Sequence, residues 1–258
     1  MITGLVGRNG AGKTTTFKAI LGLVTKDSGT IHLFDKDISS LQQEDKERIG
    51  AVLPCALFSD DLSIHAIMNV LSALYHNFDQ SHFMELVHQF KLPLNKPVRT
   101  FSTGMRTTLS LVIALTHKAD FLILDEPTAG LDVVVRNALL DLLRKYMEEN
   151  PTHTILISSH NAKDLETLCD DFYMIDQGKI LLHEETDNLL NDYAVLKVNE
   201  EQFENLEKNL LLSSVREPYG YQCLVRERQY FIENHKDMIV ERCSIDDIVA
   251  MLSKGGLS

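Results

Sequence analysis

The strand candidates of this sequence are runs of apolar residues with little polar alternation. Residues 2–6, 121–124 and 154–159 are such runs, and stretches with helical spacing of apolar residues separate them. Strands without polar alternation are buried on both faces, which is typical of a parallel sheet covered by helices on either side. Further predicted strands cover 31–34 and 49–53, and predicted helices cover 14–21, 107–116 and 133–149. This order of elements predicts an α/β fold built on a mostly parallel sheet.

Two other regions differ from this pattern. Between residues 61 and 90 apolar side chains recur at the spacing of a helix face, which predicts two or more helices. From Tyr193 onward the charge is high, and short strand candidates at 194–198, 221–225 and 229–232 mix with helical segments. We therefore expect a small α+β extension over residues 191–258.

Composition narrows the class of protein. The chain has 258 residues with 44% hydrophobic content, enough for one large α/β domain and a smaller appendage. Its net charge of −12 argues against electrostatic wrapping of nucleic acid. No apolar run reaches the roughly 20 residues that span a bilayer, and the N-terminus lacks the pattern of a signal peptide. We expect a cytoplasmic chain whose membrane role, if it has one, comes through a partner.

The cysteines give no sign of a metal site or of a disulfide framework. They are widely scattered, without a C-x-x-C pair and without a histidine spacing suited to zinc. We interpret them as reduced, mostly structural thiols: Cys55, Cys169, Cys223 and Cys243.

A complete G-x-x-x-x-G-K-[ST] pattern follows the first predicted strand and opens the first predicted helix. In that context, the backbone N–H groups of the loop surround phosphate oxygens and the helix dipole favours the anion. Lys13 is placed to reach the β and γ phosphates, and the Thr14 hydroxyl to bind Mg²⁺. The alternative is a glycine-rich turn with a chance lysine. The residues expected to bind the nucleotide are Gly7, Arg8, Asn9, Gly10, Ala11, Gly12, Lys13, Thr14 and Thr15.

A second nucleotide motif closes the strand 121–124. Asp125 is expected in the Mg²⁺ shell together with Thr14, and Glu126 beside the γ-phosphate, where it can polarise the attacking water. The alternative is a buried strand that happens to end in solvated acids. Beside a phosphate loop, the sequence favours an NTP-hydrolysing site that uses Mg²⁺ as cofactor.

Three weaker segments complete a recognisable order. Ser102-Thr103-Gly104-Met105 opens a helix about 20 residues before the paired acids, Ala129-Gly130-Leu131-Asp132 follows them as a turn, and His160 ends the strand 154–159. Together with the phosphate loop, this order resembles the ATP-binding subunits of ABC transporters over residues 1–190. The resemblance implies a P-loop fold of the ABC ATPase type with a helical subdomain at about 56–118.

The resemblance also implies roles for these segments. His160 would contact the γ-phosphate and take part in catalysis with Glu126. A second ATPase subunit, in a homodimer or a heterodimer, would pair head-to-tail with this one around two ATP molecules. The residues that would reach the ATP of that partner subunit are Ser102, Thr103, Gly104, Met105 and Asp132.

The sequence departs from the family pattern in three places. In the signature segment at residues 102–105, Thr103 and Met105 stand where Gly and Gln are commonest, a tolerable change because backbone N–H groups do much of the binding. Pro54-Cys55 stands where the family usually has Gln, which puts Mg²⁺ and water contacts from that loop in doubt. Few residues precede the phosphate loop, and the family usually carries there two strands and an aromatic residue that stacks on adenine. We therefore expect weak discrimination between ATP and GTP. A short match at residues 243–252 resembles the closing helix of bacterial exporter ATPases, although an ordinary amphipathic helix fits as well.

Two functions stay open. The first is an energy-coupling ATPase that docks on a separate integral membrane permease, at the inner face of the cell membrane, and exports a drug, peptide or lipid-like cargo. The second is a soluble ABC-type ATPase that acts on ribosomes or DNA ends, against which stand the single ATPase unit and the lack of a basic tract. A small GTPase is excluded, because no Asn-Lys-x-Asp motif is present. We favour the transporter subunit, with ATP as substrate and no nucleic-acid partner.

Overall fold

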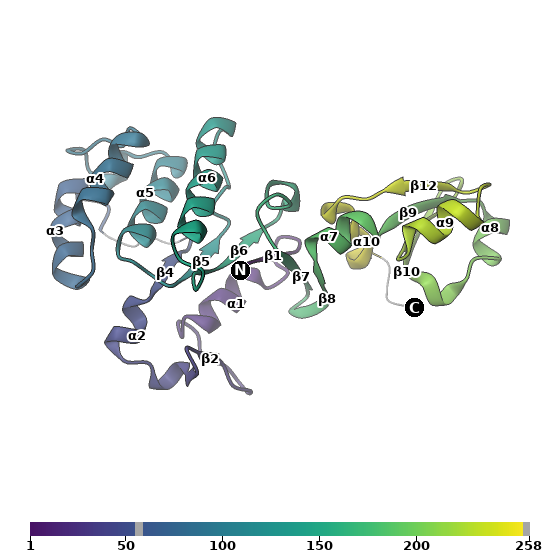
Figure 1. Ribbon diagram of the computed structural model, residues 1–258, viewed down its shortest axis with the longest axis horizontal. Coiled ribbons are helices and arrows are strands. Elements are labelled where there is room, and N and C mark those ends of the chain that lie inside the picture. The colour runs from purple at the N-terminus through teal and green to yellow at the C-terminus, as the bar shows by residue number, and fades with distance from the viewer. Residues whose placement is uncertain (55–58, 255–258) are drawn as a thin grey trace. The chain divides into compact units, whose positions relative to one another are not determined.

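The computed structural model describes residues 1–54 and 59–254 (Figure 1). Its Cα positions divide into two compact units. The first unit comprises Met1–Thr3 and Lys13–Ser159, and the second comprises Gly4–Gly12 and the chain from His160 onward.

A parallel sheet organises the first unit. Its strands are β4 (Ile49–Val52), β5 (Phe121–Asp125) and β6 (Thr154–Ser159), paired in that order. Three helices pack on these strands: α1 (Lys13–Ile20), α5 (Thr103–Thr116) and α6 (Val133–Glu149). In Figure 1, α1 lies on one side of the strands and α5 and α6 lie on the other. The predicted parallel strands with helices on both faces are confirmed, and the absence of polar alternation follows from this two-sided cover.

A helical region lies beside this sheet in the first unit (Figure 1). It contains α3 (Ile64–Leu74), α4 (Gln80–Gln89), the 3-10 turn η2 (Val98–Thr100) and one face of α5. The two helices predicted between residues 61 and 90 are confirmed. Their shared core contains the fully buried Ile67, Leu71 and Phe83. The helix predicted from residue 107 begins four residues earlier, at Thr103.

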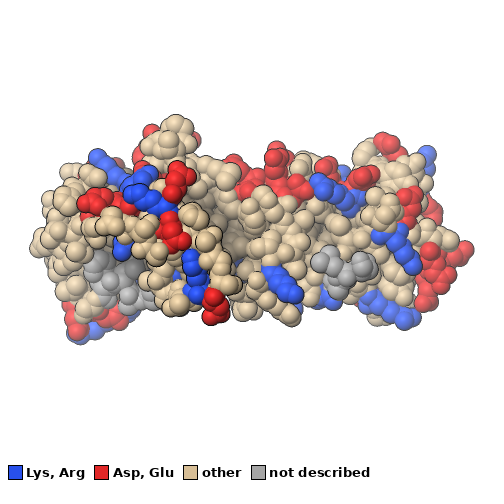
Figure 2. Space-filling model, turned by 90° about the horizontal axis from the view of Figure 1, so that it is seen from below, with Lys and Arg blue, Asp and Glu red and all other residues tan. Residues whose placement is uncertain are grey.

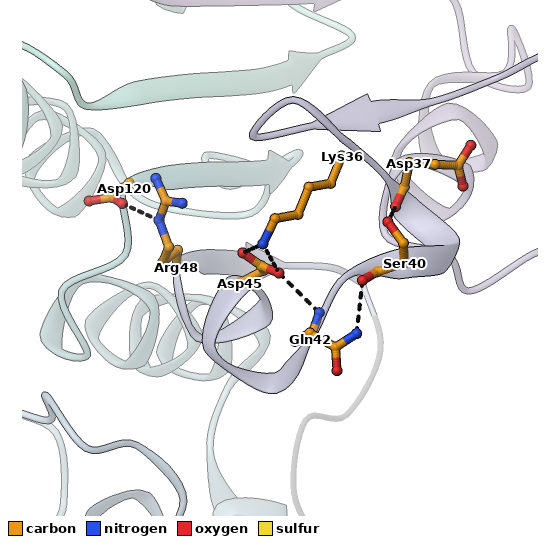
Figure 3. A network of polar contacts seen from close by, with 7 residues as sticks. All are labelled: Lys36, Asp37, Ser40, Gln42, Asp45, Arg48 and Asp120. Atoms are coloured by element: carbon orange, nitrogen blue, oxygen red, sulfur yellow. Dashed lines mark hydrogen bonds and ion pairs between the residues drawn. The ribbon is translucent and has the colours of Figure 1, made fainter.

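The chain between α1 and β4 forms a small polar subassembly. It consists of β2 (His32–Leu33), β3 (Lys36–Asp37), the 3-10 turn η1 (Ile38–Ser40) and α2 (Gln43–Glu47). The strand predicted over 31–34 is therefore only two residues long. Figure 3 shows how side chains tie these pieces together: Lys36 Nζ donates to Asp45 Oδ1 at 2.7 Å, and Asp45 Oδ2 accepts from the Gln42 N–H at 3.0 Å. Arg48 Nε donates to Asp120 at 2.6 Å, which joins the end of α2 to the start of β5.

The second unit begins with the inner part of β1 (Ile2–Val6), a fully buried strand that confirms the prediction. A hairpin of β7 (Asp171–Asp176) and β8 (Lys179–Glu185) follows the 3-10 turn η3 (Ala162–Asp164), and α7 (Thr186–Asn191) continues from it. Gly4 allows β1 and β7 to approach, because a Cβ atom at Gly4 would lie 2.4 Å from the ring of Phe172.

An antiparallel sheet forms the rest of the second unit. Its strand order is β10 (Leu211–Glu217), β11 (Gly220–Val225), β9 (Ala194–Val198) and β12 (Ile239–Arg242). The helical elements between and after these strands are α8 (Glu200–Glu204), η4 (Lys208–Leu210), α9 (Arg228–Asn234) and α10 (Ile245–Lys254). The predicted strands at 194–198 and 221–225 are confirmed, as is a helix near 243–252. The domain boundary at residue 190 stays a prediction.

The strand predicted at 229–232 is wrong, because this segment belongs to α9. Aromatic and β-branched residues favour a strand there, yet only Phe231 of the helix is buried. Side chains reach along the helix instead: Gln229 donates to Glu233 at 2.7 Å, and Asn234 donates to the carbonyl of Tyr230 at 2.9 Å. One buried residue, Phe231, suffices to anchor one face of a helix to the core. A strand with one buried face would instead bury every second residue.

Candidate nucleotide-binding site

A buried carboxylate stands at the carboxyl end of β5. Asp125 is only 3% exposed, and Thr14 Oγ1, in the first turn of α1, donates to its Oδ2 at 2.6 Å. Ser158 Oγ, on the neighbouring strand β6, donates to its Oδ1 at 2.6 Å. The two residues predicted to bind Mg²⁺ are therefore in direct contact. Hydroxyl and carboxylate oxygens are donors that suit Mg²⁺, which takes few protein ligands and completes its shell with phosphate and water oxygens.

The next residue, Glu126, faces the lysine of the phosphate loop. Its Oε1 lies 3.3 Å from Lys13 Nζ, and the two side chains are 18% and 7% exposed. The backbone of Glu126 is left-handed, with φ of 51°, and its N–H donates to Ser158 Oγ at 3.0 Å. Partial burial keeps water from screening this ion pair fully. The first unit thus brings together Lys13, Thr14, Asp125 and Glu126, as the sequence motifs predict.

The loop before Lys13 takes its shape from glycines. Gly10 and Gly12 have φ of 82° and 119°, which side-chain-bearing residues rarely adopt. Gly7 is required for a different reason, since a Cβ atom there would lie 2.2 Å from the carbonyl oxygen of Ile175 in β7. The N–H of Gly178, in the β7–β8 turn, donates to the Ala11 carbonyl at 2.8 Å. The β7–β8 hairpin therefore holds the loop in place through this hydrogen bond.

The outer side of this loop is open to solvent. Arg8, Asn9 and Gly10 are exposed, and together with Ala11 and two residues of the β7–β8 turn they line a hollow of about 370 Å³. Thr15, in the first turn of α1, is exposed as well. A solvent-accessible loop just before a helix N-terminus is open to an anionic ligand.

The segments predicted to act on a partner's ATP form a second cluster. Ser102 caps α5 by accepting from the Met105 N–H at 3.2 Å. A Cβ atom at Gly104 would lie 3.1 Å from Leu131 Cδ2, so the start of α5 packs on the turn before α6. Asp132 is exposed and caps α6, with its Oδ1 2.9 Å from the N–H groups of Val134 and Val135.

A cavity of about 350 Å³ reaches from the paired acids to the helix that Ser102 caps. Thr103 and Thr107 of α5 line it together with Asp125, Glu126 and Ala129. The paired acids and the start of α5 thus line one cavity within the first unit.

His160 directly follows β6, is exposed and belongs to the second unit. The 3-10 turn η3 comes next, and the C-terminal helix α10 holds it: Asp246 Oδ1 accepts from the Ala162 N–H at 2.8 Å. In return, Glu166 Oε1 accepts from the Ile245 N–H at 3.2 Å. These contacts connect the C-terminal elements to the chain just after the predicted catalytic histidine.

Among the described cysteines, Cys169, Cys223 and Cys243 are free and buried, as predicted. Burial raises the pKa of the Cys223 thiol to about 12, and mainly burial does the same for Cys243, so both stay protonated at neutral pH. Cys55 lies outside the described residues, so the predicted departure at Pro54-Cys55 stays a prediction.

A sequence model of the family described as "ABC transporter" matches residues 1–129, half of the chain. The chain belongs to the ABC transporter family. The ABC transporter ATP-binding protein YtrB of Bacillus subtilis (strain 168) is 32% identical over 197 residues, which cover 76% of this chain and 67% of that protein. The lantibiotic transport ATP-binding protein SrtF of Streptococcus pyogenes is 34% identical and covers 72% and 80%. The bacitracin transport ATP-binding protein BcrA of Bacillus licheniformis is 34% identical and covers 70% and 59%.

Solved structures agree on the fold. The ATP-binding subunit of an ABC transporter superposes with a TM-score of 0.65 at 24% identity, covering 73% of this chain and 80% of that one. A dimeric ATP-binding cassette in a post-hydrolysis state, bound to ADP and Pi, gives a TM-score of 0.62 at 18% identity and covers 72% and 85%. The family match and these relatives make the chain an ATP-binding ATPase subunit of the ABC transporter family, and the solved structures show its P-loop fold.

Three sets of contacts were not predicted from the sequence: those of Ser158 with the paired acids, that of Asp246 with η3, and the capping of α6 by Asp132. Ser158 carried a usable signal, because a serine in a largely apolar strand must find a buried partner. The contacts of Asp246 depend on tertiary packing and leave no local pattern.

Proposed function

We propose that this ABC ATPase binds MgATP on residues 7–15 and hydrolyses it with Glu126, and that a separate membrane permease uses the energy for export. The convergence of Lys13, Thr14, Asp125 and Glu126 at the end of β5 carries the proposal. A lysine, a hydroxyl and two carboxylates in this arrangement supply a phosphate contact, a metal-binding pair and a group to orient water.

Each residue has a defined task in the proposed reaction. Lys13 exchanges its contact with Glu126 for the β and γ phosphates, and the released Glu126 carboxylate accepts a hydrogen bond from the attacking water. Thr14 and Asp125 are the residues that would hold Mg²⁺ through their oxygens. Bound Mg²⁺ supplies charge neutralisation for the phosphate oxygens. His160 follows β6 and is proposed to contact the γ-phosphate.

A second ATPase subunit completes each site in this proposal. Ser102, Thr103, Gly104 and Met105 at the start of α5, with Asp132 on the adjoining turn, would bind the ATP of that partner subunit. The exposed position of Ser102 and Thr103 supports this role, as do the side chains of Val133 and Val134 beside Asp132, which are 59% and 78% exposed. Exposed apolar residues beside a helix N-terminus suit a surface that another protein covers.

Coupling to a permease places the protein at the inner face of the cell membrane. No helix within residues 1–54 and 59–254 has the length and apolar character required to cross a bilayer. The names of the relatives SrtF and BcrA specify lantibiotic and bacitracin transport, which supports an export system. On the face shown in Figure 2, acidic and basic side chains are interspersed, which favours a protein partner over nucleic acid.

The Glu126→Gln variant tests the proposal. It should bind ATP, lose turnover by at least about 100-fold, and accumulate as an ATP-bound dimer. The assays are steady-state phosphate release and size-exclusion chromatography with light scattering, with and without MgATP. Wild-type turnover in this variant would remove Glu126 from catalysis, and a monomer under MgATP would contradict the proposed pairing of subunits.

A further inference from the structure

Ser158 is a polar residue at a fully buried position. It lies in β6, is 0% exposed, and sits opposite Asp125 in the parallel register of β5 and β6. A buried hydroxyl is destabilising unless it is hydrogen-bonded, and Ser158 makes two hydrogen bonds. Both lead to the paired acids of the nucleotide site.

The chemistry of these two bonds is directional. The Ser158 hydroxyl donates its single proton to Asp125 Oδ1, 2.6 Å away. The oxygen lone pairs are then left for the Glu126 N–H, 3.0 Å away. One hydroxyl therefore fixes the side chain of the first acid and the backbone of the second.

The backbone of Glu126 requires such support. Its φ of 51° lies in the left-handed region, which is sterically unfavourable for a residue with a Cβ atom. This conformation belongs to the arrangement in which the Glu126 carboxylate faces Lys13 at 3.3 Å. A hydrogen bond to the Glu126 N–H offsets the strain and stabilises that direction of the side chain.

We infer that Ser158 is a positioning residue for hydrolysis, which aims the Glu126 carboxylate. The inference rests on the proposed function, because it acts through Glu126. Loss of the hydroxyl leaves Lys13 and the phosphate loop intact but lets Glu126 leave the productive direction. A displacement of about 1 Å in a catalytic group lowers turnover by about 100-fold. The expected loss is thus in kcat, about 10- to 100-fold, with little change in nucleotide affinity.

The matched pair Ser158→Thr and Ser158→Val isolates the hydroxyl. Threonine and valine have the same shape, so both variants place the same extra methyl group in the buried site, and only threonine keeps the hydrogen bonds. We expect Ser158→Thr to keep kcat at least 10-fold above that of Ser158→Val, with similar ATP affinity measured both with and without Mg²⁺. Equal kcat in the two variants would overturn the inference.

A control variant separates positioning from the general effect of losing a buried hydroxyl. Ser213→Ala removes another buried hydroxyl, which is 1% exposed and donates to the Met251 carbonyl at 2.7 Å. Ser158→Ala and Ser213→Ala should lower the midpoint of urea unfolding to a similar degree, whereas only Ser158→Ala should lower kcat. Loss of kcat in both would assign the effect to stability and overturn the inference.

The double variant Ser158→Ala with Glu126→Gln distinguishes a failure of the inference about Ser158 from a failure of the proposed role of Glu126. If Ser158 acts through Glu126, adding Ser158→Ala to Glu126→Gln leaves the residual single-turnover rate unchanged. A further 10-fold drop would overturn the inference while the role of Glu126 stands. Normal turnover of Glu126→Gln alone would instead contradict the proposed function.

Discussion

The ion pair between Lys13 and Glu126 predicts that Glu126→Gln tightens nucleotide binding, in addition to stopping turnover. The γ-phosphate brings negative charge to Lys13 and must displace the Glu126 carboxylate, which lies 3.3 Å from Lys13 Nζ. A neutral amide at this position removes the competing anion and its repulsion of the phosphate. The variant should therefore bind the nucleotide more tightly than the wild type.

The size of the effect follows from the distance and the burial. Unit charges 3.3 Å apart attract by about 1 kcal/mol in water and by about 5 kcal/mol at an effective dielectric constant of 20. The phosphate then neutralises Lys13 in place of Glu126, so only part of this energy changes the binding. We expect a gain of about 1–2 kcal/mol, which is about 5- to 30-fold in Kd.

Isothermal titration with a non-hydrolysable ATP analogue measures this change without interference from turnover. The control is Asp141→Asn in α6, which removes the same unit of negative charge from a side chain that is 65% exposed. The control should leave Kd within about twofold, because exposed charges are screened by salt. Equal affinities of Glu126→Gln and wild type, or equal tightening in both variants, would refute the reasoning from the ion pair.

Three further predictions concern the second unit. Gly7→Ala should lower the free energy of unfolding by about 1–3 kcal/mol in urea titrations, because its Cβ would overlap the Ile175 carbonyl. The hydrogen bond from Asn188 is the main cause that lowers the pKa of Glu184 below its ordinary value of 4.5. A lowered carboxyl pKa stabilises the protein above the unfolded pKa, and this contribution is lost as the pH falls through the folded pKa. Urea midpoints of Glu184→Gln should consequently fall less than those of wild type between pH 7 and about pH 3. Asp246→Asn should speed hydrogen exchange at the η3 amides about 10-fold, which hydrogen-exchange mass spectrometry measures, and unchanged exchange would contradict this role.

The sequence predicts best those elements whose own residues show an apolar run, an N-cap or a regular apolar spacing. The strands β1, β5 and β6 are largely apolar runs, and the helix α6 has both an N-cap at Asp132 and regular apolar spacing. Each of these segments carries its own signal, so no knowledge of its neighbours is needed.

The predictions fail where packing overrides local preference. The segment of α9 has the composition of a strand, but one buried anchor, Phe231, fits the core as a helix. The strands β10 and β12 were not predicted. Both have half-exposed or exposed residues and lie at the edges of their sheet, where burial leaves a weak pattern.

The residues of the candidate site likewise divide into those that the sequence identifies and those that only the structure identifies. Motif spacing identifies Lys13, Thr14, Asp125 and Glu126, because contiguous motifs encode these groups. The role of Ser158 depends on the register between β5 and β6, which places it opposite Asp125. Register follows from pairing across the sheet, so the serine in a largely apolar strand indicates that a buried partner is required but not that the partner is Asp125.

ATP binding by the wild type and by Lys13→Ala tests the central claim most directly. Lys13 is the lysine of the phosphate loop, it is buried to 7% exposure, and it contacts the proposed catalytic carboxylate. With fluorescent ATP and Mg²⁺, we expect saturable binding by the wild type and at least about 10-fold weaker binding by Lys13→Ala, since a hydrogen bond to a charged phosphate is worth about 1.5–3 kcal/mol. Equal affinity of the two proteins would contradict the assignment of this loop as the nucleotide site.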